Sequence, residues 1–138
     1  MHADRGFTLL EVALVLCVTA LLTALVSRAM PSAAERGMRE ESQRLVAALE
    51  RARALSRASG EAVTLRIDAG RWEFRGAQTA RLLPQQWLYP STHAAAAQLV
   101  LGPDPIIPPQ HIELFGEAGA HVRIATDGVR PFVVEATP

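Results

Sequence analysis

An apolar run opens with RGFTLLE at residues 5–11 and continues to Val26. After Phe7 the run is almost wholly Leu, Val and Ala, and its single charged residue is Glu11. A helix of about 20 residues is about 30 Å long, which matches the hydrocarbon core of a bilayer. The run's other polar side chains belong to threonines, whose hydroxyls can bond to backbone carbonyls one turn earlier: Thr8, Thr19 and Thr23. The run is therefore predicted to form a membrane-spanning helix.

Glu11 places a charged side chain inside a run that is otherwise suited to lipid, and this position requires an explanation. An acidic side chain in a membrane helix costs a few kcal/mol at the centre of the bilayer and less near its edge. A carboxylate at this place in the run indicates a partner for it.

The sequence GFTLLE at residues 6–11, followed by an apolar helix, resembles the N-terminal signature of type IV pilins and type II secretion pseudopilins. The resemblance implies a leader at residues 1–6 that a membrane-embedded prepilin peptidase removes after Gly6. Phe7 would become the N-methylated first residue of the mature chain. Glu11 would meet the terminal amine of a neighbouring subunit in the filament.

Two simpler interpretations compete with this one. A plain membrane anchor explains the apolar run but gives Glu11 no purpose. A secretory signal peptide would end in an Ala-x-Ala-like cleavage site, and residues 25–29, Leu-Val-Ser-Arg-Ala, are poor candidates for one.

Composition limits the remaining possibilities. The chain has 138 residues and zero formal net charge, so no overall field attracts it to nucleic acid. The length fits one soluble domain after the apolar run. Cys17 is the single cysteine, which excludes an intramolecular disulfide.

The orientation in the membrane depends on which argument is used. Arg5 lies beside Asp4 before the run, whereas Arg28, Arg36 and Arg39 follow it, and counting these basic residues would place the C-terminal part in the cytoplasm. The family resemblance implies the opposite, with the leader in the cytoplasm and the body in the periplasm, and we adopt this orientation.

Residues 32–59 are predicted to form a second helical stretch, continuous with the first across a kink at Pro31. Apolar residues recur there at helical spacing, in one stripe made of Leu45, Ala48, Leu49, Ala52 and Leu55. Charged residues are predicted to occupy a solvated face: Arg44, Glu50, Arg51, Arg53 and Arg57. Gly60 is the expected helix stop.

Short strands follow. Residues 62–68 and 71–75 alternate and form a predicted hairpin around the turn at residues 69–70, with Trp72 and Phe74 inward. Residues 98–101, 111–115, 122–126 and 131–136 are further predicted strands, and residues 86–89 are a possible one. Asp127-Gly128 predicts a hairpin between the last two.

The expected fold class is therefore α+β, with a long N-terminal helix packed on a C-terminal antiparallel sheet. The resemblance makes this a pilin-like fold and divides the chain into a leader (1–6), a transmembrane and assembly helix (7–30) and a periplasmic pilin-like domain (31–138). That domain comprises the amphipathic helix at 32–59 and a β-region at 61–138.

Two later segments resemble the H-type minor pseudopilins (GspH) of type II secretion. They are the proline-rich GPDPIIPPQ at residues 102–110 and DGVRPF at residues 127–132. The helix end at residues 53–60 is also similar. An ordinary rigid loop is the alternative explanation for the proline-rich segment.

No pattern of catalytic residues or cofactor ligands is present in the sequence. His93, His111 and His121 lack zinc-site spacing and are interpreted as loop or surface residues. Asp104 and Asp127 lie in turn sequences, where Asp is common. The sequence contains no Gly-x-Ser-x-Gly, phosphate-binding glycine loop or His-Glu-x-x-His. We therefore expect neither an enzyme nor a metal or other cofactor.

The resemblance implies a structural subunit of the periplasmic pseudopilus that drives protein export across the outer membrane. Its partners would be other major and minor pseudopilins, the prepilin peptidase and the inner-membrane assembly platform. The alternative is a minor type IV pilin of the FimT type, in pilus biogenesis or DNA uptake. Phosphate binding needs clustered cations, and residues 129–135 hold one Arg and one Glu, so nucleic acid is not an expected partner.

Overall fold

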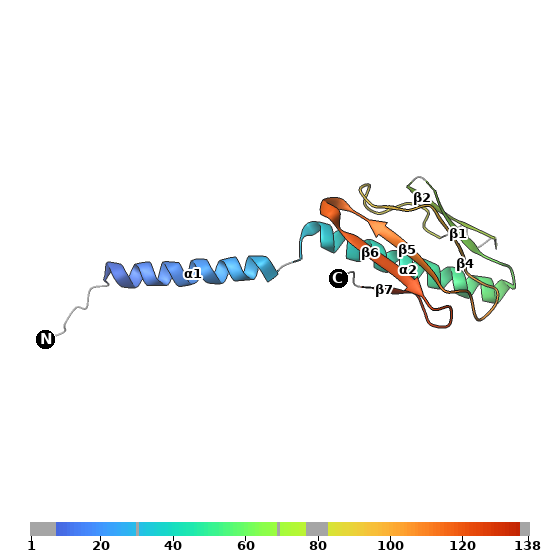
Figure 1. Cartoon of the computed structure of the whole chain (residues 1–138), viewed down its shortest axis with the longest axis horizontal. Helices are drawn as coiled ribbons and strands as arrows, with labels where there is room; N and C mark the ends of the chain where they lie inside the picture. The colour runs from blue at the N-terminus through green and yellow to red at the C-terminus, as the bar shows by residue number, and fades with distance from the viewer. Residues whose placement is uncertain (1–7, 30, 69, 77–82, 136–138) are drawn as a thin grey trace. The chain divides into compact units, whose positions relative to one another are not determined.

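The computed structural model describes residues 8–29, 31–68, 70–76 and 83–135 and divides the chain into two units, Met1–Ser32 and Ala33–Pro138 (Figure 1). The first unit contains helix α1 (Leu9–Ala29). Its segment Leu9–Val26 has a mean hydropathy of 2.6 and is long and apolar enough to span a membrane. The predicted backbone bonds of the threonines form at Thr19, whose hydroxyl donates to Val15 O at 2.9 Å, and at Thr23, whose hydroxyl donates to Thr19 O.

The second unit begins with helix α2 (Ala33–Ser59). The prediction of one helix kinked at Pro31 is wrong, because Pro31 and Ser32 are not helical and two separate helices result. Proline lacks the N–H that a helix interior requires and disfavours helical geometry in the residue before it. Serine is favoured directly before a helix, which suits Ser32 to precede the start of α2.

Seven strands form two antiparallel sheets in the described residues. The first sheet has the order β2-β1-β4, from β1 (Thr64–Asp68), β2 (Arg71–Arg75) and β4 (Ala97–Val100). The second has the order β3-β5-β6-β7, from β3 (His93–Ala94), β5 (Gln110–Phe115), β6 (His121–Thr126) and β7 (Val133–Glu135). A short 3-10 helix at Glu117–Gly119 connects β5 to β6. Both predicted hairpins are confirmed, and the chain is α+β.

One strand prediction is wrong, and one short strand was not predicted. Residues 86–89 form no strand, because the N–H groups of Leu88 and Tyr89 donate to the carboxylate of Glu41 on α2 rather than to a neighbouring strand. The two-residue strand β3 was not predicted. It is too short to show the alternation by which a strand is recognised in a sequence.

The core lies between α2 and the two sheets, which run along the helix (Figure 1). Leu45, Leu49 and Ala52 of the predicted stripe are fully buried, and Leu55 is partly buried. The first hairpin contributes the inward residues that the alternation predicted, Val63, Leu65, Ile67, Trp72 and Phe74. Strands β5 and β6 add Ile112, Leu114 and Ile124 to the core. The predicted core is confirmed.

Candidate functional site

Glu11 lies in the first turn of α1 and is exposed, whereas Gly6 and Phe7 lie outside the described residues. Thr8 directly precedes the helix, and the Glu11 N–H donates to its carbonyl at 3.0 Å and, more weakly, to its hydroxyl at 3.4 Å. Thr8-x-x-Glu11 has the spacing of a capping box. A carboxylate in this turn is also favoured by the helix dipole. The spacing and the helix dipole therefore favour an acidic residue at position 11 independently of any partner.

The side chains of α1 are exposed over the part of the helix whose burial is described. Every side chain from Thr8 to Val26 is exposed, with Leu9 at 91% and Leu25 at 67%. Apolar area of this extent on all sides of a helix is stable in lipid or against other apolar helices. Cys17 is a free thiol on this helix. The site thus consists of an apolar helix with one acidic group at its N-terminal end.

A second acidic group is important within the second unit. Glu41 of α2 is completely buried, and its Oε2 accepts hydrogen bonds from the N–H groups of Leu88 at 2.6 Å and Tyr89 at 3.1 Å. Its Oε1 lies 3.5 Å from Arg44, which also donates to Gln86 O at 3.1 Å. The Tyr89 hydroxyl donates to Glu40, and this hydrogen bond raises the pKa of the tyrosine. One face of α2 thereby holds residues 86–89 in place.

The prediction that Arg53 belongs to a solvated face is wrong. The Arg53 side chain is buried, with 3% of the residue exposed. Its guanidinium donates to the carbonyl oxygens of Arg130 and Gly128 at 3.0 Å each and of Pro105 at 3.4 Å. Burial of a guanidinium requires this kind of satisfaction, because a buried ion without partners is strongly unfavourable.

Glu50 completes the arrangement from one turn away. Its Oε1 accepts the Phe132 N–H at 2.9 Å and lies 3.7 Å from Arg53 Nη1. We call the contacts of Arg53 and Glu50 with residues 105 and 128–132 the Arg53 junction. It joins α2 to the proline-rich segment at residues 102–110 and to the segment at residues 127–132.

The loop between β6 and β7 has its own internal bonds. Asp127 Oδ1 accepts the N–H groups of Arg130 at 2.8 Å and Val129 at 3.0 Å, and these bonds lower the pKa of the Asp127 carboxyl. Asp127 is therefore a turn residue, as predicted. Gly128 has φ +92°, and an added Cβ would lie 1.8 Å from Ile107 O. Glycine is required at this position by both conformation and space.

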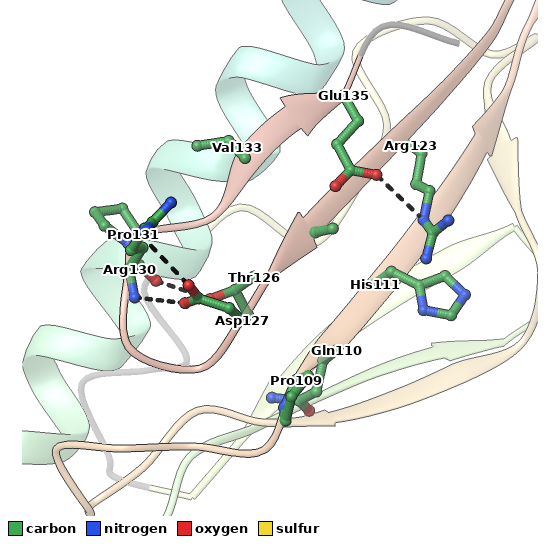
Figure 2. Close-up of a pocket in the computed structure, with 11 residues that line it drawn as sticks. Pro109, Gln110, His111, Arg123, Thr126, Asp127, Arg130, Pro131, Val133 and Glu135 are labelled. Atoms are coloured by element: carbon green, nitrogen blue, oxygen red, sulfur yellow. Dashed lines mark hydrogen bonds and ion pairs between the residues drawn. The ribbon is translucent and has the colours of Figure 1, made fainter.

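An open hollow of about 440 Å³ lies beside this loop, lined in part by His111, Arg123 and Val133. Figure 2 shows Glu135 reaching Arg123 across the strands and Asp127 facing Arg130. Each of these ion pairs has a closest N–O distance of 3.5 Å. Cations and anions alternate around the hollow, so it does not present a basic surface.

His93, His111 and His121 lie on strands rather than in loops, in β3, β5 and β6 respectively. His93 and His111 are exposed, as predicted for surface residues, and His121 is partly buried. Phe115 lies on β5, between His93 on β3 and His121 on β6. Both histidine rings stack on the Phe115 ring, with centroid distances of 5.6 Å for His93 and 4.8 Å for His121. Among the described residues, no three His, Cys, Asp or Glu side chains are grouped so as to hold a metal ion.

No family model matches this chain, and neither a curated protein nor a solved structure matches it.

Proposed function

We propose that this chain is a minor pseudopilin of a type II secretion system, of the H type (GspH). It would be a single-pass inner-membrane protein with Ala33–Pro138 in the periplasm, acting as a structural subunit of the pseudopilus. The observation that carries the proposal is an exposed apolar helix with a carboxylate in its first turn, in a chain that continues as an amphipathic helix and antiparallel sheets. This α+β layout is compatible with a pilin-like fold.

The role of Glu11 follows from the cost of burying a charge. Near the bilayer edge the carboxylate reaches headgroups and water. In a bundle of apolar helices a lone charge would cost several kcal/mol. The amine of a neighbour's first residue, created by removal of the leader, would neutralise it there. The ion pair would then favour correctly placed subunits over misplaced ones.

The distribution of charge supports a structural role over DNA uptake. The arginines of the described C-terminal part, Arg123 and Arg130, each face a carboxylate, whereas phosphate contacts need cations that are clustered and available. In the proposed function the partners are other pseudopilins, the prepilin peptidase and the assembly platform.

The first test concerns the N-terminus. Protein made together with an active prepilin peptidase is expected to lose residues 1–6 and to begin at a methylated Phe7, because the motif at residues 6–11 is the peptidase signature. Intact-mass measurement with N-terminal sequencing gives the answer. A mature chain that begins near Ala29 would identify an ordinary signal peptide and refute the proposal.

The second test separates the two roles of Glu11. Loss of a helix cap costs about 0.5–2 kcal/mol, less than an unpaired buried charge. Glu11→Ala removes both the capping-box pattern and the charge, whereas Glu11→Gln retains the capping-box pattern and removes the charge. Both variants are expected to be cleaved normally but to crosslink poorly to partner pseudopilins and to impair secretion.

Thr8→Val is the matched control, because it removes the capping hydroxyl and preserves the carboxylate; it is expected to assemble nearly as the parent does. If Glu11→Gln assembled normally while Glu11→Ala failed, Glu11 would be only a helix cap. Normal assembly of Glu11→Ala would contradict both roles.

A further inference from the structure

The two sheets have four edges, and three of them are protected in the described residues. Strand β4 is capped at Val100, whose N–H donates to the Gln110 side chain at 2.8 Å and whose carbonyl accepts from it at 2.9 Å. Strand β2 carries charged residues at alternate positions, which discourage pairing with other strands: Arg71, Glu73 and Arg75. Strand β3 has two residues. The remaining edge is β7.

Strand β7 carries the exposed end of a row of apolar residues that runs across the second sheet. Ile112, Ile124 and Val134 are aligned across β5, β6 and β7. Ile112 is 2% exposed and Ile124 is 0% exposed, but Val134 is 42% exposed. No strand of the described residues pairs with the outer side of β7. One more strand on that side would extend the sheet and cover Val134 as the inner strands cover their isoleucines.

The opposite face of the same sheet shows an alternation of charge. Glu113, Arg123 and Glu135 are aligned across β5, β6 and β7, and Arg123 lies 3.5 Å from Glu135. Facing pairs of opposite charge stabilise antiparallel strands and like charges destabilise them. A basic residue is therefore the complementary neighbour for Glu135 on the next strand. Val133, on the same face, is 53% exposed and adds apolar surface.

We propose that β7 is a docking edge that pairs with an extended segment of a different protein chain. The segment places an apolar side chain beside Val134 and a basic side chain beside Glu135. Its backbone bonds to the outer edge of β7, which no described strand occupies, in the manner of β-strand addition. This proposal rests on the sheet alone and does not depend on the proposed function.

Two labelled peptides, TVRVRVT and TVEVEVT, test the proposal against the full chain in a non-ionic detergent. Fluorescence anisotropy is expected to show about fivefold tighter binding of the basic peptide, since facing charge pairs contribute up to about 1 kcal/mol. Hydrogen exchange is expected to show new protection at residues 133–135 when this peptide is bound. Glu135→Arg is expected to reverse the preference.

Glu117→Arg is the matched control, because it makes the same change of charge at an exposed position outside the four-stranded sheet. It is expected to retain the preference for the basic peptide. Circular dichroism of each variant verifies that the fold is intact. Equal binding of both peptides, no binding, or protection confined to other residues would overturn the proposal. Concentration-dependent dimerisation that Val134→Lys abolishes would also overturn it, because the occupant would then be a second copy of this chain.

Discussion

Replacing Arg53 by methionine is the sharpest test of how the second unit is held together. Methionine preserves much of the apolar stem of arginine and removes the guanidinium. The change deletes three hydrogen bonds to backbone carbonyls and the ion pair with Glu50. It should therefore separate the polar role of Arg53 from its packing.

The loss of stability depends on which other hydrogen bonds the acceptors of Arg53 retain in the variant. Arg130 O still accepts the Thr126 hydroxyl at 2.7 Å, and Gly128 O still accepts the Ile107 N–H at 3.2 Å. Glu50 still accepts the Phe132 N–H, and its side chain is 30% exposed, so water can solvate it. Breaking a buried ion pair costs about 3–5 kcal/mol when the partner is left buried and unpaired. Because most partners here retain a bond, we expect Arg53→Met to lower the free energy of unfolding by about 2–3 kcal/mol.

The assay is denaturant unfolding of the full chain in detergent, followed by the fluorescence of Trp72 and Trp87. Arg57→Met on the exposed side of the same helix is the control and is expected to change stability by less than about 0.5 kcal/mol. Glu50→Gln combined with Arg53→Met should give a coupling below about 1 kcal/mol, because the pair is 3.7 Å apart and Glu50 is partly solvated. An Arg53→Met variant as stable as Arg57→Met would refute the role assigned to the Arg53 junction.

Two further predictions concern the loop that Arg53 holds. Gly128→Ala is expected to destabilise the protein by about 2–4 kcal/mol in thermal unfolding, because its Cβ would meet the backbone at Ile107. Gly119→Ala, at φ +76° with open space around it, is the control and is expected to lose about 1–2 kcal/mol. Equal losses in the two variants would contradict the close contact at Gly128. The pKa of Asp127 is lower in the folded chain than its ordinary value of 3.8, so its carboxylate stabilises the fold above that pH and the contribution is lost as the pH falls further. Asp127→Asn should remove this part of the acid dependence, and an unchanged pH–stability profile would contradict it.

Much of the second unit follows from periodicity. The stripe of Leu45, Leu49 and Ala52 predicts the buried face of α2, and strict alternation predicts the inward residues of β1 and β2. These patterns are reliable because a helix or strand must bury one face and expose another. Periodicity does not predict a structure that depends on a single polar contact. At residues 86–89, the carboxylate of Glu41 accepts hydrogen bonds from N–H groups that would pair with a neighbouring strand if these residues formed one.

The prediction for Arg53 is wrong because a charged side chain was expected to be exposed, and no prediction was made for Glu41. Glu41 lies four residues before Leu45, and Arg53 lies four residues after Leu49, so both continue the helical spacing of the buried stripe. The spacing was a usable signal. What the sequence does not supply is the partner, because the acceptors of Arg53 come from backbone 52 to 77 residues further along the chain.

The Arg53 junction also gives a physical reason why the proline-rich segment and the DGVRPF loop belong together. Ile107 donates its N–H to Gly128 O, and Ile107 O occupies the space that any side chain at position 128 would need. Arg53 then bonds to both segments at once, through Pro105 and through the loop carbonyls. Each segment taken alone is an ordinary turn sequence, but their contact requires the glycine in one, the fixed path of the other and a buried cation on α2. A change in Gly128, in the path of the proline-rich segment or in Arg53 should therefore be compensated only by changes in the other two. These three features form a single structural unit although they are far apart in the sequence.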